Sequence, residues 1–331
     1  MRLSAFSVLD AFPKGSDGNR DRYRELLDLA EQCEDSGLHG IWVAEHHFHP
    51  GGLCPAPPVL LSAIGARTER LRLGVMVSVL PFHEPVDLAE QYALVDQLTQ
   101  GRLNLGVGSG YIPMEFEGFG IDPATKRERF DAALETLLSA FRGEAVRVGK
   151  GRQPKVTLNV RPRQQPSPPI TVAVQRREAL VPLAQRGRSI ALIPYATVSG
   201  IDELSEEIDE YRRSLPPGSK AQVAVAVHIW VGAPKETGRA ALQRYLDSRL
   251  ATQSKYYQEK VRRDPSARQA RTLEEAGLAL IGSAEEVTLG LERFRDAGVD
   301  EVLGIFDFGG LPIDAVRASV RALGERWPQE A

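Results

Sequence analysis

The stretch Leu71–Leu80, with the sequence LRLGVMVSVL, consists mostly of Leu and Val. A continuous apolar run is typical of a strand that is buried on both faces of a parallel sheet, whereas a half-exposed strand alternates polar and apolar residues. Amphipathic helices are predicted on both sides of this stretch, over Pro57–Arg67 and Asp87–Leu98. A doubly buried strand flanked by helices indicates an α/β protein with a parallel sheet.

The same alternation of apolar strand, polar turn and amphipathic helix continues along the chain in both directions. The predicted strands are Leu3–Leu9, Gly40–Ala44, Leu71–Leu80, Leu103–Val107, Ile170–Val174, Ser189–Ile193, Gln222–Val231 and Asp300–Phe306. Two of the helices are predicted to begin with capping boxes, Thr125 with Glu128 and Ser283 with Glu286. Eight strand–helix units favour a (β/α)8 TIM barrel in one domain, 1–331, with a doubly wound open sheet as the alternative because periodicity does not show closure.

Two segments exceed the minimal strand–helix repeat. Residues 143–169, after the fourth helix, are rich in Gly, Pro and Arg and are predicted to form an insertion. Residues 234–282, after the seventh strand, are too long for one unit and contain a strongly charged stretch at 255–275. We expect this stretch to be a mobile surface segment, either a lid over a site or a plain solvated insertion.

The composition excludes several classes of protein. A net charge of −3 without a long basic block does not favour nucleic acid as a partner. Two cysteines are too few for a disulfide framework or a Cys-rich zinc site and suggest a reducing compartment. No apolar run is long enough for a membrane span, and the N-terminal residues do not resemble a signal peptide. We expect a soluble cytoplasmic protein.

In a TIM barrel, function lies at the carboxyl ends of the strands. The residues predicted there are Glu45–His47, Ser78–Phe82, Gly106–Tyr111, Gln175–Arg177, Tyr195 and Asp307–Gly310. Histidine titrates near neutral pH and suits proton transfer, so a His beside Glu45 is a candidate catalytic residue. Because neighbouring residues on a strand point to opposite faces, we expect only one of His46 and His47 to face the barrel.

Other motifs at these strand ends admit further interpretations. His47-Phe48-His49 has the spacing of a metal-binding pair, but no further His follows strands 4, 5 or 6, so no metal site is predicted. The glycines of GVGSG, 106–110, do not have dinucleotide-loop spacing and serve either an unusual turn or the close approach of a flat ligand. Gln175-Arg176-Arg177 precedes a helix, where N–H groups and guanidinium groups can bind phosphate.

Several longer pieces together resemble a known family. They are WVAEHHF (42–48), RLRLGVMVSVLPFHEPVDLAEQ (70–91), VDQLTQGRLNLGVGSGY (95–111), EFEGFGID (115–122), RPRQQPSPPI (161–170) and DFGGLPIDAVRAS (307–319). In this order and spacing, over nearly the whole chain, they resemble the bacterial-luciferase-like flavin-dependent monooxygenases.

The resemblance implies a TIM barrel that binds flavin at its mouth. In that family a separate NAD(P)H:flavin reductase supplies reduced FMN, which reacts with O2 to a flavin C4a-hydroperoxide that oxygenates a small organic or carrier-tethered substrate. The implied catalytic residue is His46, next to Glu45, and a homodimer is implied. The candidate flavin-binding residues are Met76 and Val77, which the resemblance implies are joined by a cis peptide, then Ser78, Gly108, Ser109 and Tyr111, and, from the phosphate motif described above, Gln175, Arg176 and Arg177.

The chain also departs from the family pattern. Luciferases have an arginine for the flavin phosphate where this chain has Ser109, and Gly108 occupies the position of their reactive cysteine. Since Arg176 and Arg177 stand where luciferases have Ser-rich residues, our hypothesis is that the phosphate-binding charge has moved from strand 4 to strand 5. The alternatives are a site for the deazaflavin F420 in an oxidoreductase, or a non-catalytic flavin-binding or subunit-type protein.

Overall fold

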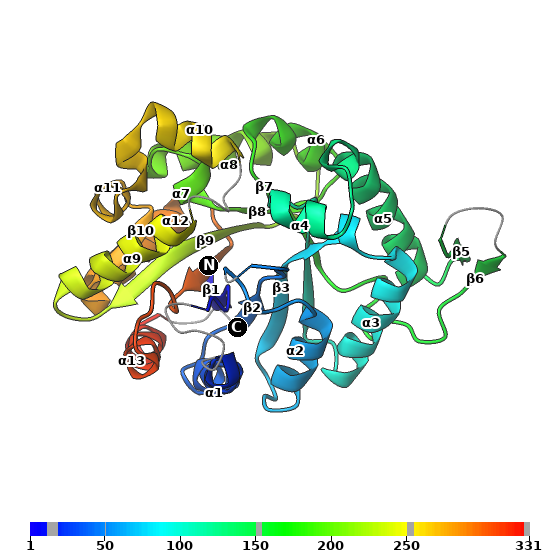
Figure 1. Ribbon diagram of the computed structural model, residues 1–331, viewed down its shortest axis with the longest axis horizontal. Coiled ribbons are helices and arrows are strands. Elements are labelled where there is room, and N and C mark those ends of the chain that lie inside the picture. The colour runs from blue at the N-terminus through cyan, green and yellow to red at the C-terminus, as the bar shows by residue number, and fades with distance from the viewer. Residues whose placement is uncertain (12–18, 50, 150–153, 250–254, 328–331) are drawn as a thin grey trace.

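A computed structural model describes residues 1–11, 19–49, 51–149, 154–249 and 255–327, and in these residues eight parallel strands form a closed barrel (Figure 1). The barrel strands are β1 (Arg2–Ser7), β2 (Gly40–Val43), β3 (Arg72–Val79), β4 (Leu103–Gly108), β7 (Ile170–Val174), β8 (Ser189–Leu192), β9 (Val223–Val231) and β11 (Glu301–Ile305). Pairing of β8 with β9 closes the ring, which confirms the TIM barrel and excludes the open sheet.

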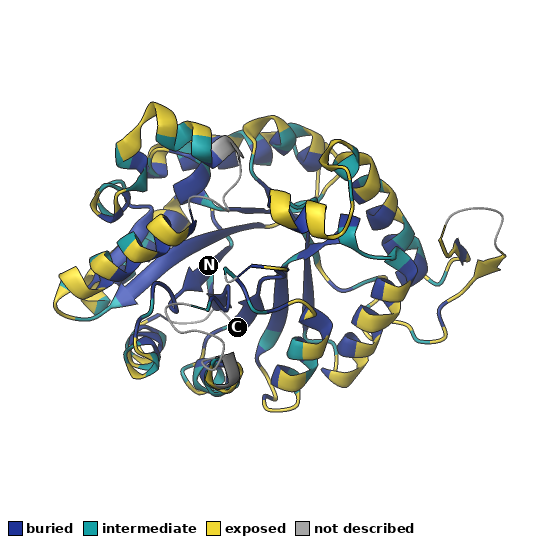
Figure 2. Cartoon of the chain, viewed as in Figure 1, coloured by how far each residue is buried: buried dark blue, intermediate teal, exposed yellow. Residues whose placement is uncertain are grey.

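Helices surround the barrel and bury their apolar faces against it (Figure 2). They are α1 (Asn19–Asp35), α2 (Pro57–Gly65), α3 (Pro85–Leu98), α5 (Lys126–Phe141), α6 (Leu180–Gln185), α8 (Ile201–Arg213), α12 (Ala284–Asp296) and α13 (Ile313–Gly324). In α5, for example, Phe130, Leu134 and Leu137 form the buried stripe that their spacing predicts. None of the helices in the described part of the chain has the length and apolar character needed to cross a membrane.

Only one of the two predicted capping boxes is present. Ser283 and Glu286 form it at the start of α12. Thr125 does not cap α5: its backbone is already helical, and its hydroxyl donates to the Asp122 carbonyl. The prediction was wrong there because a 3-10 turn, Pro123–Thr125, runs directly into α5, so no extended residue precedes that helix.

The first predicted insertion forms a small projection from the barrel. In its described part, β5 (Val146–Arg147) pairs antiparallel with β6 (Lys155–Val156), and the two stand away from the barrel (Figure 1). Residues 150–153 of this insertion lie outside the described residues.

The second long segment is more structured than predicted. It forms α9 (Lys235–Arg249), α10 (Lys255–Arg263), a 3-10 turn (Pro265–Arg268), α11 (Ala270–Glu275) and β10 (Ala279–Gly282), while residues 250–254 lie outside the described residues. The strand β10 was not predicted; it pairs with the outer end of β9.

The charged stretch in this segment packs against the barrel. Tyr257 of α10 is fully buried, and the Lys260 ammonium donates to the carbonyls of Tyr195 and Val198, at the short helix α7 (Pro194–Thr197). A plain solvated insertion is therefore the wrong description. Its mobility stays a prediction.

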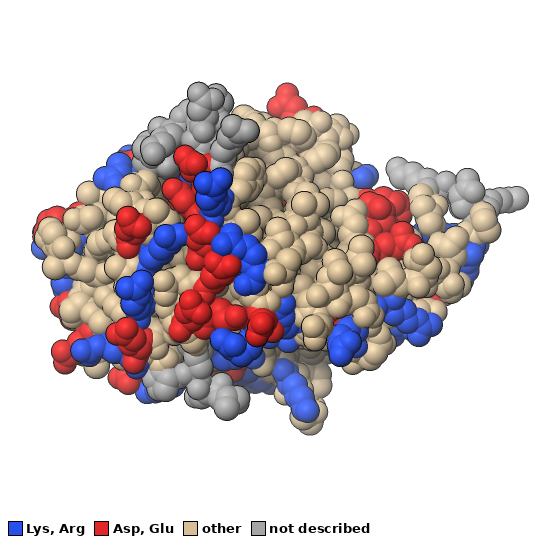
Figure 3. All heavy atoms as spheres, turned by 90° about the horizontal axis from the view of Figure 1, so that it is seen from below, with Lys and Arg blue, Asp and Glu red and all other residues tan. Residues whose placement is uncertain are grey.

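Charges of both signs are interleaved on the surface. In Figure 3, acidic and basic side chains are intermingled on the left part of the face shown, and a smaller group of acidic side chains lies toward the right. Ion pairs also join neighbouring helices: Asp28 of α1 contacts Arg67 at 2.9 Å and Arg317 of α13 at 3.0 Å. This arrangement agrees with the small net charge, and the described residues of this face form no broad basic surface for a polyanion.

Candidate functional site

The carboxyl ends of the barrel strands surround a cavity of about 440 Å³, which we call the mouth cavity. Predicted site residues that line it are Glu45, His46, Met76, Val77, Gly108, Ser109, Tyr111, Gln175 and Arg176.

Another cavity, of about 460 Å³, lies at the amino ends of the strands. There Arg72 donates to the Gly101 and Leu103 carbonyls, and Glu301 accepts from Ser4 and Trp42. Because Arg72 and Glu301 are engaged by these protein groups and the predicted site residues line the other cavity, the mouth cavity is the candidate site.

Two predicted cofactor-binding residues are absent from the lining of the mouth cavity. Ser78 is fully buried, and its hydroxyl donates to Glu45 at 3.0 Å. Arg177 is exposed and forms an ion pair with Glu210 of α8 at 2.8 Å. Since Arg176 is extended and Arg177 begins a 3-10 turn, the two side chains diverge, and only Arg176 reaches the cavity. The prediction of a paired arginine site is corrected to a single arginine.

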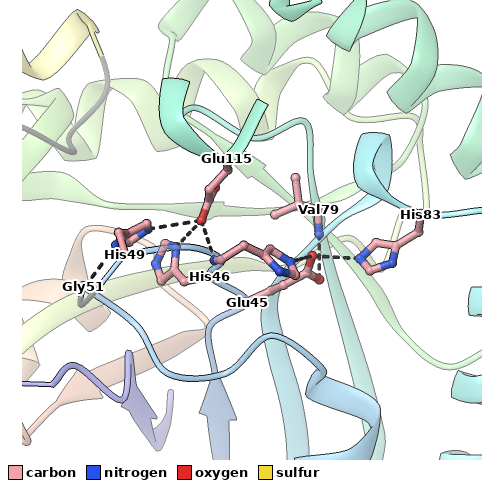
Figure 4. A network of polar contacts seen from close by, with 8 residues as sticks. Glu45, His46, His49, Gly51, Val79, His83 and Glu115 are labelled. Atoms are coloured by element: carbon pink, nitrogen blue, oxygen red, sulfur yellow. Dashed lines mark hydrogen bonds and ion pairs between the residues drawn. The ribbon is translucent and has the colours of Figure 1, made fainter. Parts of the chain in front are cut away.

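Glu115 organises one histidine cluster at the cavity wall (Figure 4). It lies on the short helix α4 (Pro113–Gly118), and one of its carboxylate oxygens is 3.1 Å from His46 Nδ1 and 3.2 Å from His49 Nε2. The same oxygen accepts the backbone N–H of His47 at 3.0 Å. We call His46, His49 and Glu115 the Glu115 triad.

The electrostatics of the Glu115 triad favour a negative carboxylate and a neutral histidine. Burial alone would raise the pKa of Glu115, but hydrogen bonds from His46 and His49 outweigh it and lower that pKa to about 2. Burial lowers the pKa of His46, and the positive charge of Arg249 lowers it further, against the opposing hydrogen bond to Glu115. A neutral imidazole in contact with a carboxylate can accept a proton near pH 7.

Glu45 organises a second cluster, which we call the Glu45 triad. Its Oε1 lies 3.0 Å from His47 Nε2 and 2.7 Å from His83 Nε2. Its Oε2 accepts from the Ser78 hydroxyl at 3.0 Å and from the Val79 N–H at 3.1 Å. Burial would raise the pKa of Glu45, but the hydrogen bonds from His47 and His83 lower it to about 2.

The adjacent residues Glu45 and His46 therefore do not form the pair that their positions suggest. His46 contacts Glu115, whereas Glu45 contacts His47. His46 lines the mouth cavity and His47 is not in its lining, as expected, but both lie beyond the end of β2, so strand alternation is not the reason. His49, which the sequence offered only as one half of a metal-binding pair with His47, belongs to the Glu115 triad.

Each triad has the residue types of a metal site. In each, three ligand atoms lie within 4.8 Å of one another, in the part of the chain that the structure describes. The sequence argument against a metal, which was a shortage of ligands, is wrong because it left out Glu115 and did not place His83 beside Glu45 and His47. In both triads, however, a single carboxylate oxygen lies within hydrogen-bond distance of both imidazoles, so hydrogen bonds between the members already account for the geometry.

The glycines of β4 fit against β3. The Met76–Val77 peptide is cis, as the family resemblance implied. A Cβ on Gly106 would lie 2.3 Å from the Val75 carbonyl oxygen, and one on Gly108 would lie 2.6 Å from a Val77 methyl group. Gly110 has φ of +76°, which confirms the unusual turn. The neighbouring strand therefore already excludes side chains at 106 and 108, and the close approach of a flat ligand stays a prediction.

Sequence reasoning missed Arg249, which also lines the mouth cavity. It is the last residue of α9, is only 4% exposed and has its guanidinium carbon 5.0 Å from the Tyr245 ring centre. The spacing of Tyr245 and Arg249, four residues apart in a helix, was the available signal. Arg249 was overlooked because no helix was predicted within residues 234–282, so the two positions were not placed on one helical face.

The remaining cations of the cavity lie on a different side. Lys126, Arg127 and Arg176 line it near the ends of β4 and β7, and we call them the cationic edge. The Lys126 ammonium donates to the Gly110 carbonyl at 3.0 Å, directly after Ser109. A phosphate group beside Ser109 and Gln175 would therefore be close to positive charge.

Comparisons with known proteins agree with this geometry. A family model described as luciferase-like monooxygenase matches residues 1–301. The uncharacterised protein y4wF of Sinorhizobium fredii is 31% identical over 94% of this chain and 92% of its own length. The oxygenase component of the flavin-dependent trigonelline monooxygenase of Acinetobacter baylyi is 25% identical over 73% of this chain and 68% of its own length.

Solved structures share the fold at low sequence identity. One is the oxygenating constituent of 3,6-diketocamphane monooxygenase of Pseudomonas putida in complex with FMN, with a TM-score of 0.77 at 18% identity over 98% of this chain and 97% of that one. An F420-dependent secondary alcohol dehydrogenase matches with a TM-score of 0.73 at 16% identity over 97% and 98% of the two chains. Together, the family match over residues 1–301 and the closed barrel show that the chain belongs to the luciferase-like monooxygenases.

Proposed function

We propose that this protein is the oxygenase component of a two-component system, which uses reduced FMN from a separate NAD(P)H:flavin reductase and O2 to oxygenate a small organic substrate. The observation that carries the proposal is His46, which lines the mouth cavity while its Nδ1 contacts the buried Glu115 carboxylate. The relative from Acinetobacter, an oxygenase component by name, supports the two-component arrangement.

The residues of the cavity fit a flavin. Met76 and Val77 supply an apolar wall for a ring system, and the cationic edge supplies charge for a phosphate. Reduced flavin, when bound, supplies the electrons that activate O2. The chain itself would hold the ring and the phosphate, and α10 would help to shield the cavity from water.

His46 is the residue that would handle protons in this reaction. Contact with the Glu115 carboxylate favours the tautomer with hydrogen on Nδ1, which leaves Nε2 as an acceptor. Because its pKa is lowered, the imidazole is mostly neutral near pH 7 and can take a proton from the substrate or the bound cofactor.

An anaerobic titration of the purified protein with reduced FMN tests the proposal, followed by admission of O2 with a panel of substrates. We expect saturable binding of reduced FMN and O2-dependent product. A protein that binds F420 in preference to reduced FMN and transfers hydride without O2 would be an F420-dependent oxidoreductase instead. Ser109, which replaces the arginine of luciferases, keeps that alternative open. Binding without turnover would indicate a non-catalytic flavin-binding protein.

The cationic edge offers a matched pair of variants for the cofactor. R176A should weaken FMN binding about tenfold, because it removes a charge from the cavity wall. R177A should leave FMN binding unchanged, because that side chain is engaged by Glu210 outside the cavity. Equal dissociation constants for FMN in wild-type and R176A proteins, measured by fluorescence titration, would contradict this phosphate site.

The proposal includes a homodimer. Val59 of α2 and Leu94 and Leu98 of α3 are 70%, 50% and 61% exposed, and the two helices are neighbours on the barrel surface (Figure 1). Apolar side chains on adjacent helices favour burial against a second copy. Analytical ultracentrifugation should give twice the chain mass of 36.3 kDa, and a monomeric mass would contradict the dimer.

A further inference from the structure

Arg249 places a buried positive charge in the wall of the mouth cavity, away from the cationic edge. Ser109 and Arg176 follow β4 and β7. Arg249 lies instead near residues that follow β1 and β2. Its guanidinium is 3.9 Å from the Asp10 carboxylate, which follows β1. A Cβ atom placed on Gly51, which follows β2, would lie 3.0 Å from the same guanidinium. In the barrel order, β1 and β2 are separated from β7 by β3 and β4. The cavity is therefore positive on two separate sides.

The contacts of Arg249 fix its plane and leave its charge in place. The guanidinium carbon stands 5.0 Å from the Tyr245 ring centre, and Nη2 lies 3.9 Å from Asp10. The Asp10 carboxylate is shared between two guanidinium groups, because Arg22 also lies 4.0 Å from it. The shorter contact of Arg22, at 2.5 Å, is with Asp307.

Phenol groups surround the same guanidinium. Tyr111, Tyr195 and Tyr245 all line the cavity, and burial raises the pKa of each, so their hydroxyls stay protonated. Burial alone would lower the pKa of Arg249, but the pKa is raised instead, with the negative Asp10 carboxylate among the causes, and the guanidinium stays charged. Protonated phenols and a guanidinium are hydrogen-bond donors, which is the set that binds a carboxylate.

We propose that Arg249, together with Tyr111 and Tyr245, binds the carboxylate of an anionic organic substrate next to His46. This inference rests on the proposed function, because it assigns the second positive side of the cavity to the substrate once the cationic edge has taken the flavin phosphate. A carboxylate here would place the rest of the substrate in the cavity beside the residue that handles protons. Small organic acids are thus preferred over their neutral analogues.

The test uses the full-length protein without flavin and three pairs of probes: benzoate, hexanoate and N-acetylglycine, each with its primary amide. Isothermal titration should show that at least one acid binds the wild-type protein about tenfold more tightly than its amide. R249Q should abolish this preference, whereas R176Q should keep it. Equal binding of acid and amide in every pair, or no binding of any acid at millimolar concentration, overturns the proposal even if R249Q does not fold.

A second measurement separates the substrate from the flavin phosphate. If Arg249 binds substrate, the dissociation constant of FMN for R249Q should lie within threefold of the wild-type value. The dissociation constant of FMN for R176Q should be higher than the wild-type value. A large loss of FMN affinity in R249Q, with riboflavin affinity unchanged, would assign Arg249 to the phosphate and overturn the inference. A protein that binds acids through Arg249 but no reduced flavin would contradict the proposed function alone.

Discussion

The two triads at the mouth have the same composition but different surroundings. Each is a glutamate held between two histidines, and in each the carboxylate pKa is lowered to about 2. The second oxygen of Glu45 is bound to the hydroxyl of Ser78 and the N–H of Val79, so the Glu45 triad joins β2 to β3 inside the protein. The Glu115 triad instead presents His46 to the cavity.

The difference shows that residue type and spacing do not define a catalytic group. A carboxylate whose four hydrogen bonds all go to protein groups stabilises the fold, whereas one that supports a histidine on a cavity wall positions that histidine. We therefore expect variants of the Glu115 triad to change turnover, and variants of the Glu45 triad to change mainly the free energy of unfolding.

The largest effect is expected for H46A. Loss of the proton-handling imidazole should lower turnover by about 10²-fold or more, with FMN binding largely kept. Product formation with added flavin reductase and NADH measures turnover, and fluorescence titration measures FMN binding. Nearly unchanged turnover would assign His46 to structure and remove the distinction between the triads.

E115Q should lower turnover by about tenfold, because the amide keeps the size of the side chain but loses the charge that holds His46. Since the carboxylate raises the pKa of His46, its loss should also move the acid limb of the pH–rate profile to lower pH. A fall in turnover without a change in that profile would indicate that Glu115 only maintains the local fold.

E45Q should cost about 2 kcal/mol in the free energy of unfolding at neutral pH, with a smaller effect on turnover per folded molecule. The folded pKa of Glu45 is below its unfolded value, so its contribution is present above pH 4.5 and declines as the pH falls toward 2. Urea denaturation of wild-type and E45Q proteins at pH 7 and pH 4 should show the difference shrinking. A constant difference would exclude ionisation as its origin.

The smallest effect is expected for H83Q. Burial would lower the pKa of His83, but Glu45 raises it above the usual value. Its ionic contribution, about 1 kcal/mol at most, should be complete below pH 6.5 and lost as the pH rises through the folded pKa. Denaturation at pH 5.5 and 8.5 should therefore separate H83Q from wild type more at the lower pH. The opposite trend would show that His83 is neutral in the fold.

The barrel could be predicted from the sequence, because each strand carries its own local pattern of apolar residues. The strand β10 could not, since Ala279–Gly282 is only four residues long and its neighbour is β9, not a segment next to it in sequence. For the same reason Glu115 and His83 escaped detection: each approaches its triad from another strand–helix unit, and nothing local to His46 or Glu45 records that approach.

The close fit between β3 and β4 has a consequence for the history of the family. A side chain at position 108, where luciferases have a cysteine, would meet a Val77 methyl group at 2.6 Å. Positions 77 and 108 are therefore expected to change together in evolution: a larger residue at one is tolerated only with a smaller residue at the other. A larger side chain at position 108 would therefore require either a smaller residue at position 77 or a shift of β3 away from β4.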